Sequence, residues 1–117
     1  MTPAPIKPTV GHQTLEALDI RVGTIVLVED LPKSSRLVRL TVDFGDHRRR
    51  IIAGLKTERA DPQEIEGRQA LFVVNLEPKT IRGEVSEGML FDLGFADGIA
   101  PALAVPERPV PDGTRAG

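Results

Sequence analysis

Glycine and proline recur so often in this chain that they limit every segment of regular structure to a short length. The 117 residues include 11 glycines and 10 prolines. Both residue types end or bend helices and strands. The composition therefore favours short strands joined by turns over a bundle of long helices.

Overall composition fits one compact domain and excludes several kinds of site. Hydrophobic residues make up 40% of the chain and charged residues 27%, as in globular proteins. Cysteine is absent, which excludes disulfides, zinc knuckles and thiol chemistry. No apolar run approaches the roughly 20 residues of a membrane span, and the first residues, MTPAPIKPTVGHQ, lack the apolar stretch of a signal peptide. We expect a cytoplasmic protein that does not insert into membranes.

The middle of the chain carries the clearest strand patterns. Residues 20–28 are rich in β-branched residues and predict a strand, in which Gly23 indicates a bulge or a bend. Residues 37–44 alternate with the two-residue period of a half-buried strand. The residues that share the apolar face are Val38, Leu40, Val42 and Phe44. Residues 45–47 form a tight connection into residues 48–53, which predicts a hairpin.

Weaker signals organise the rest. Asp61 and Pro62 predict a helical turn that runs to Glu66 and ends at Gly67, and Thr14 is expected to cap another turn over residues 15–18. Residues 69–75 read as an apolar strand, and short strands are expected around 80–81, 88–93 and 102–105. We expect residues 1–13 to form a flexible arm and residues 106–117 a proline-punctuated tail. Burial preference places the phenylalanines in the core; these are Phe44, Phe72, Phe91 and Phe95.

Five or six short strands with one helical turn between the third and fourth predict an all-β fold. The best match is a five-stranded Greek-key barrel of the OB-fold type, with short helical turns. A β-sandwich is the alternative, but it usually has more strands than this chain supplies. We assign residues 14–117 to this barrel domain and its C-terminal extension.

Charge is distributed unevenly along the sequence. Residues 33–59 hold eight cations and three carboxylates, whereas the rest holds seven cations and fourteen carboxylates. A positive face can bind phosphate by counterion release even when the net charge of the protein is −2. The alternative is that Arg48, Arg49 and Arg50 only keep a hairpin solvated. With no tyrosine or tryptophan, few side chains can stack on bases, which favours a folded RNA over a random single strand.

Nothing in the sequence indicates an active site. His12 and His47 have no neighbouring ligands that would make a metal pair. Ser86 stands near Glu84 and Glu87 without a histidine, which is a weak signal for a nucleophile. Neither a Walker loop nor a GxGxxG motif occurs. We expect no enzyme activity, no cofactor and no metal.

The run NLEPKTIRGEVSEGML at residues 75–90 is the densest motif. Lys79 and Arg82 offer two cations around a turn that Gly83 permits, and Met89 offers an adaptable apolar contact. Read without a partner, the same run is an ordinary crossover between barrel strands.

This run closely resembles the signature of the tRNA-binding domain, which occurs in free-standing proteins and in some methionyl- and phenylalanyl-tRNA synthetases. The resemblance extends to LDIRVGTIVLVEDLP at 18–32, LTVDFG at 40–45 and RRIIAGL at 49–55. The C-terminal PERPVPDGTRAG also resembles the CsaA branch of export chaperones. Gly88 and Met89, by contrast, favour the tRNA-binding branch. Because these two features point to different branches, the sequence leaves the branch open.

The resemblance implies an OB-fold homodimer that holds the outside of a folded tRNA and catalyses no reaction. It also implies the RNA-binding residues Arg36, Asn75, Lys79, Arg82, Ser86, Glu87, Gly88 and Met89. The alternative function is a CsaA-like chaperone that binds unfolded or export-bound polypeptides.

Overall fold

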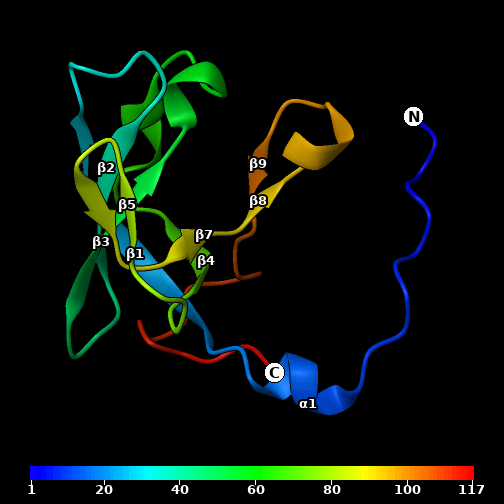
Figure 1. Cartoon of the computed structure of the whole chain (residues 1–117). Helices are drawn as coiled ribbons and strands as arrows, with labels where there is room; N and C mark the ends of the chain where they lie inside the picture. The colour runs from blue at the N-terminus through cyan, green and yellow to red at the C-terminus, as the bar shows by residue number, and fades with distance from the viewer.

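The computed structural model describes all 117 residues, and its centre is one twisted antiparallel sheet. The strand order is β3-β2-β1-β4-β7. The bounds of these strands are β1 Ile20–Asp30, β2 Val38–Asp43, β3 Arg48–Ala53, β4 Gln69–Val73 and β7 Met89–Leu90. The sheet curls into a barrel in which β3 approaches the segment around β7 (Figure 1).

Smaller elements decorate this barrel. Helix α1 covers His12–Glu16, and the 3₁₀ turns are η1 Leu55–Thr57, η2 Pro62–Ile65 and η3 Phe95–Asp97. Two hairpins lie outside the main sheet. One pairs β5 Lys79–Ile81 with β6 Glu84–Ser86, and the other pairs β8 Asp92–Leu93 with β9 Ala102–Leu103.

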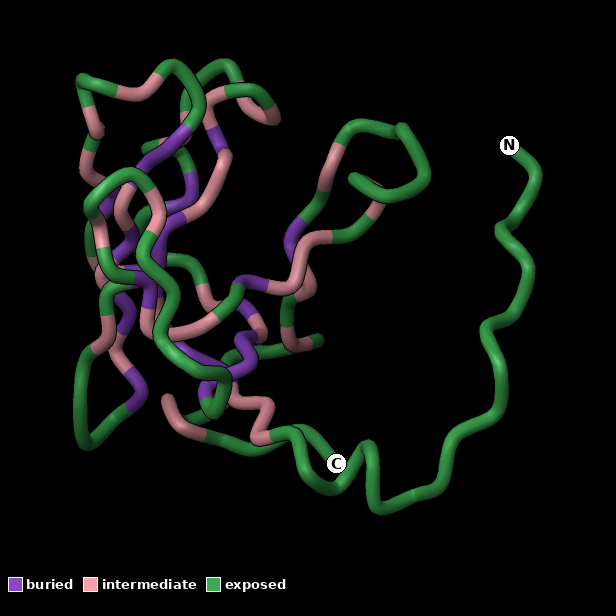
Figure 2. The backbone as a smooth tube through the Cα atoms, in the orientation of Figure 1, coloured by how far each residue is buried: buried purple, intermediate pink, exposed green.

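The alternating pattern of residues 38–44 fills the barrel as predicted. Leu40 and Val42 are fully buried, and Phe44 packs edge-on against Phe72 with ring centroids 5.5 Å apart. Figure 2 shows the buried positions gathered inside the barrel, while the N-terminal arm and the tips of the hairpins are exposed. The predicted all-β OB-type barrel is confirmed.

Gly23 allows close packing and marks no bulge, so the bulge that the sequence offered as one of two alternatives at this position is wrong. The shift of register in β1 lies between Ile25 and Leu27. A Cβ atom on Gly23 would stand 2.6 Å from Val42 Cγ1 and 2.8 Å from Phe44 Cε1. Only glycine lets β1 pass this close to the core.

Two further predictions are corrected by the structure. Helix α1 begins at His12, with Gly11 at the N-cap, so Thr14 lies inside the helix and caps nothing. Phe95 is 65% exposed because it sits on η3, which projects from the barrel. The turn at η2 is confirmed, with Asp61 Oδ1 accepting from the Gln63 amide at 3.1 Å.

The C-terminal segment packs along the first half of β1. The Val22 amide donates to the Thr114 carbonyl at 2.9 Å, and the Gly113 and Ala116 amides donate back to β1 carbonyls. Asp112 accepts a hydrogen bond from Thr24 Oγ1 at 2.7 Å. The segment expected to be a tail therefore acts as an additional edge of the barrel.

Candidate nucleic-acid interface

The loop of residues 31–37 joins β1 to β2 and is fixed by a partly buried cation. Lys56 Nζ donates to the carbonyls of Leu31 at 2.9 Å and Ser34 at 2.7 Å, and it also pairs with Asp30. Ser34 Oγ accepts from the amide of Arg36 at 3.2 Å. The loop is thus held in one shape while Lys33 and Arg36 remain exposed.

The β5–β6 hairpin ends in a two-residue turn made of Arg82 and Gly83. Their φ angles are +50° and +82°, the left-handed pair that a type I′ hairpin turn requires. The turn presents the exposed Arg82 at the tip, one strand length from Lys79 at the base.

Ser86 and Glu87 attach this hairpin to β3 and complete the barrel. The Ile52 amide donates to Ser86 Oγ at 3.0 Å, and this hydroxyl donates to the Gly88 carbonyl at 3.1 Å. The Arg50 amide donates to Glu87 Oε1 at 3.0 Å, and the Glu87 amide donates to the Arg50 carbonyl at 2.9 Å. Ser86 is only 5% exposed, so its hydroxyl is engaged within the protein.

The loop and the hairpin tip meet around a surface pocket of about 250 Å³. Lys33 and Arg82 both line it, and Arg36 follows in the same loop, where its side chain lies beside Gly54. The full lining is Leu31, Pro32, Lys33, Ser34, Leu37, Arg82 and Glu84. We call Lys33, Arg36 and Arg82 the cationic rim. Lys33 was not among the residues predicted from the sequence, although it directly follows the turn-forming Pro32.

Most cations near this pocket are already neutralised. Arg39 pairs with Glu29 at 3.2 Å and Glu84 at 3.3 Å, and these carboxylates raise the pKa of Arg39, Glu29 by the larger share. Arg59 pairs with Glu64 at 2.7 Å. By contrast, the side chains of the cationic rim and of Lys79 make no hydrogen bond or ion pair. They remain available to a polyanion, as do the exposed Arg50, Arg68 and Arg115, which lie outside the cationic rim.

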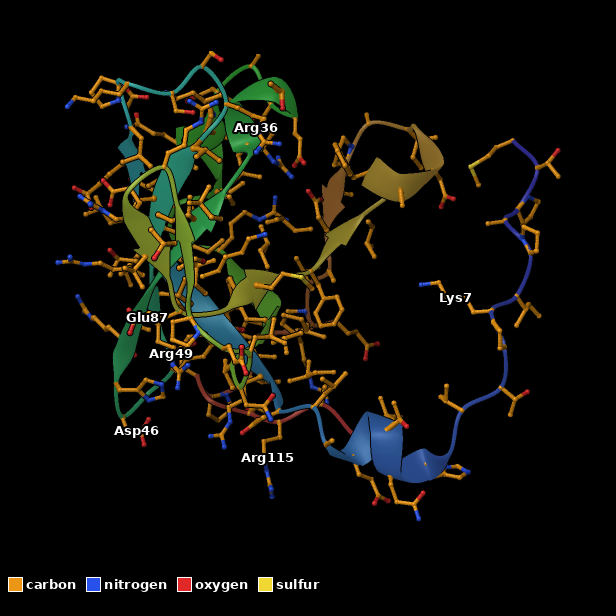
Figure 3. All side chains as sticks on the ribbon, in the orientation of Figure 1. Lys7, Arg36, Asp46, Arg49, Glu87 and Arg115 are labelled. Carbon is orange, nitrogen blue, oxygen red and sulfur yellow. The ribbon has the colours of Figure 1, made fainter.

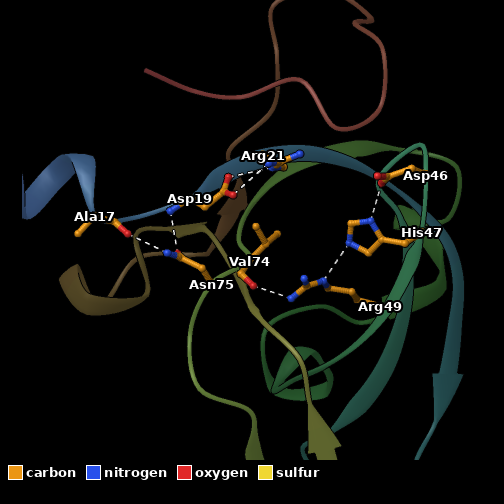
Figure 4. Close-up of polar contacts among 8 residues, drawn as sticks. All are labelled: Ala17, Asp19, Arg21, Asp46, His47, Arg49, Val74 and Asn75. Atoms are coloured by element: carbon orange, nitrogen blue, oxygen red, sulfur yellow. Dashed lines mark hydrogen bonds and ion pairs between the residues drawn. The ribbon is translucent and has the colours of Figure 1, made fainter.

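Asn75 lies at the opposite end of β1 from the cationic rim. Its Oδ1 accepts from the Asp19 amide and its Nδ2 donates to the Ala17 carbonyl, both at 2.7 Å (Figure 4). Beside it, Arg21 donates to both Asp19 oxygens and lowers the pKa of that carboxyl. Asn75 therefore ties α1 to the barrel, and the structure does not bring it near Arg36.

The two remaining residues predicted from the sequence, Gly88 and Met89, lie in different surroundings. A Cβ atom on Gly88 would stand 2.9 Å from the Val73 carbonyl oxygen, so glycine allows the chain to pass β4. Met89 is 45% exposed and faces a different hollow from the cationic rim.

The arginines of β3 do not form one patch. Arg49 turns inward, where it donates to the carbonyls of Val74 and Glu87 and to His47 Nε2 (Figures 3 and 4). Because His47 Nε2 accepts, the ring proton sits on Nδ1, 2.6 Å from Asp46 Oδ1. This bond lowers the pKa of Asp46. His47 also stacks on Phe44, so this cluster stabilises the β2–β3 turn.

No helix has the length and apolar character needed to span a membrane. No group of three or more histidine, aspartate or glutamate side chains is arranged to hold a metal ion.

Comparison with known proteins gives concordant results. Residues 20–115 match the family model described as tRNA binding domain. The methionine–tRNA ligase of Methanocorpusculum labreanum is 43% identical over 98 residues, which is 84% of this chain and 14% of that protein. The corresponding ligase of Chlorobium luteolum is 43% identical over 84 residues, or 72% of this chain and 12% of that protein. The chain thus spans about an eighth of the curated relatives it matches.

Solved structures agree over nearly the whole chain. A methionyl-tRNA synthetase-related protein from Pyrococcus horikoshii superposes with a TM-score of 0.86 at 32% identity, covering 95% of this chain and all of that one. The chaperone CsaA from Bacillus anthracis superposes with a TM-score of 0.78 at 28% identity, covering 94% of this chain and all of that one. Both branches suggested by the sequence are therefore structural neighbours, and the chain belongs to the tRNA-binding domain family.

Proposed function

We propose that this chain binds the outside of a folded tRNA through phosphate contacts and shape, and that it catalyses no reaction. The observation that supports the proposal is the cationic rim, where Lys33 and Arg82, unpaired cations from two separate elements, line one pocket and Arg36 follows in the same loop. Family membership supports the identity of the RNA. The cytoplasmic location predicted from the sequence suits this function and stays a prediction.

The predicted residues take two roles in this proposal. Arg36, Lys79 and Arg82 contact phosphates directly, joined by Lys33, and Met89 offers an apolar contact. Asn75, Ser86, Glu87 and Gly88 act as positioning residues, because their polar groups or close packing hold the hairpin and the strand ends.

The test measures tRNA affinity of the purified chain across a series of salt concentrations. Wild-type binding should weaken steeply with salt, because phosphate contacts release counterions. Arg82→Asn should lower affinity for all tRNAs alike, and it should reduce the salt slope by about 1. Asparagine suits the left-handed turn, so this variant keeps the hairpin folded.

The matched control is Arg108→Asn, which removes the same charge from an exposed arginine outside the rim that pairs with Glu107. Its affinity and salt slope should stay close to wild type. Equal losses in both variants would mean that overall charge, and not the cationic rim, governs binding.

Polypeptide binding is the second candidate. It is supported by the likeness to CsaA and by exposed apolar side chains in the β7–η3 region; these include Met89, Leu93 and Phe95. Competition between tRNA and a permanently unfolded polypeptide discriminates the two functions. Tight capture of the polypeptide that does not respond to salt, with no tRNA complex, would favour this candidate.

A homodimer is the assembly that we propose for the binding form. It rests on the family resemblance, and the exposed arm and apolar side chains of this small barrel agree with it. Light scattering at working concentration should give a mass of twice 12.7 kDa.

A further inference from the structure

The N-terminal arm, residues 1–11, makes no contact that explains its composition. All its residues are exposed, and Ile6 is 99% exposed. The backbone of the arm runs past the β8–β9 hairpin and is separated from it (Figures 1 and 2). No backbone hydrogen bond involves residues 1–10, so nothing inside one chain holds this apolar segment.

The sequence of the arm gives it a defined shape. Its three prolines, Pro3, Pro5 and Pro8, favour the extended polyproline II helix. Such a helix has three residues per turn, so Lys7 and Val10 share one side, with Ile6 next to them. A preformed extended segment of this kind loses little entropy when it enters an apolar groove.

A groove of matching character lies between η1 and the β7–η3 segment. It has a volume of about 330 Å³ and eight of its eleven lining residues are hydrophobic. These residues include Leu55, Met89, Phe91 and Phe95. The groove is open to solvent in the single chain, because Met89 and Phe95, which line it, are 45% and 65% exposed.

The groove also contains an acidic pair to which the neighbouring Arg59 and Arg36 form no ion pair, because Arg59 is paired with Glu64. Glu58 and Asp92 both line it, and Glu58 Oε2 is buried with no hydrogen-bond partner. A buried carboxylate oxygen without a partner is costly. Lys7, whose side chain extends from the arm toward the barrel without a partner (Figure 3), carries a charge complementary to this pair.

We infer that the arm of one chain docks in this groove on a second copy, with Ile6 and Val10 on its apolar wall and Lys7 at Glu58 and Asp92. The inference rests on the homodimer of the proposed function and adds the segment that joins the two copies. A second copy is the occupant because the arm of a single chain leaves its own groove empty.

The absence of cysteine allows a direct test by disulfide cross-linking. Thr9→Cys marks the arm and Ala96→Cys marks the edge of the groove. Unlabelled Thr9→Cys chains are mixed with ¹⁵N-labelled Ala96→Cys chains, oxidised mildly, and analysed by mass spectrometry. The control replaces Ala96→Cys with Ser35→Cys, which is equally exposed on the loop of residues 31–37.

The yield of the disulfide between residues 9 and 96 of differently labelled chains should be at least ten times the yield of the disulfide between residues 9 and 35. Lys7→Glu and Glu58→Gln should each reduce that link, whereas Arg108→Glu should leave it unchanged. Equal yields of the two links would overturn the inference. So would a Thr9→Cys/Ala96→Cys double variant that closes the link only within one chain, or an Ala96→Cys chain that couples to a cysteine-bearing unfolded polypeptide and not to the arm.

Light scattering on the same samples separates this inference from the proposed dimer. Dimers that form no link from 9 to 96 would refute the docked arm and leave the dimer standing. Monomers throughout would refute both, and neither result bears on tRNA binding, which is measured separately.

Discussion

At the scale of single residues, Glu58 has the most strongly shifted pKa in the molecule. Burial and the neighbouring Asp92 raise its pKa from 4.5 to about 7, although Arg59 and Arg36 oppose the shift. The folded chain therefore holds this proton over a range in which the unfolded chain has released it. Stability from this group is present at low pH and is lost as the pH rises from about 4.5 to 7.

Glu58→Gln should remove that pH dependence. The variant should lose less stability than the parent chain between pH 5 and pH 8, measured as the midpoint of urea unfolding. The chain with Glu58 and the Glu58→Gln variant are both measured with Lys7→Ala in addition, so that Lys7 of a docked arm does not offset the carboxylate charge of Glu58. Parallel pH profiles for the two chains would contradict a raised pKa at Glu58.

At Arg82, the backbone conformation is unfavourable for stability, whereas the positive charge favours the proposed binding of tRNA. Residues other than glycine pay roughly 1–2 kcal/mol in left-handed backbone, and asparagine tolerates it better. Arg82→Asn should thus raise the free energy of unfolding by about 0.5–1 kcal/mol while weakening tRNA binding. Urea unfolding measures the gain, and a matched drop in stability would show that Arg82 has structural contacts beyond the turn.

At the scale of elements, one buried hydroxyl, that of Ser86, helps to attach the β5–β6 hairpin to β3. Ser86→Ala would leave the Ile52 amide without an acceptor at a buried site. The expected loss is about 1–3 kcal/mol in the free energy of unfolding. Ser35→Ala, at an exposed serine without side-chain hydrogen bonds, should change it by less than about 0.5 kcal/mol. A Ser86→Ala effect as small as that of Ser35→Ala would show that water replaces the hydroxyl.

How much of these elements was predictable depends on how local their causes are. The buried face of residues 38–44 and the Asp61 cap follow from neighbours in sequence, and both predictions are confirmed. Strand β6 was missed because its three residues pair only across the turn. Phe95 was placed in the core on residue type alone, but η3 carries it away from the barrel.

The candidate site shows the same division. The sequence identifies a positive segment, but only the fold reveals which cations are consumed by ion pairs. Arg39 and Lys56 are neutralised by carboxylates from other strands, whereas Arg36 is left free. Asn75 belongs to the motif that carries the resemblance, yet it lies at the other end of β1.

At the scale of the whole molecule, the C-terminal segment is a latch across β1. Gly113 has a φ of +89°, and a Cβ atom there would stand 2.4 Å from the Phe44 carbonyl oxygen. Gly113→Ala should therefore displace the latch and cost roughly 2–4 kcal/mol, from backbone strain and lost hydrogen bonds.

The control is Gly67→Ala, which has a similar φ of +84° but open space around the position. It should cost only about 1–2 kcal/mol. Hydrogen exchange at the Val22 amide provides an independent readout, because this amide donates to the latch. Unchanged protection of Val22 in Gly113→Ala would show that the latch stays in place.

The latch also sets an order of events during synthesis on the ribosome. β1 is made early, but the Val22 amide has no partner until residues 113–116 have emerged. A nascent chain that stalls before them presents an unpaired strand edge, the feature by which sheets recruit other strands. Emergence of residues 113–116 thus covers the edge of β1 and protects it against association with neighbouring nascent chains.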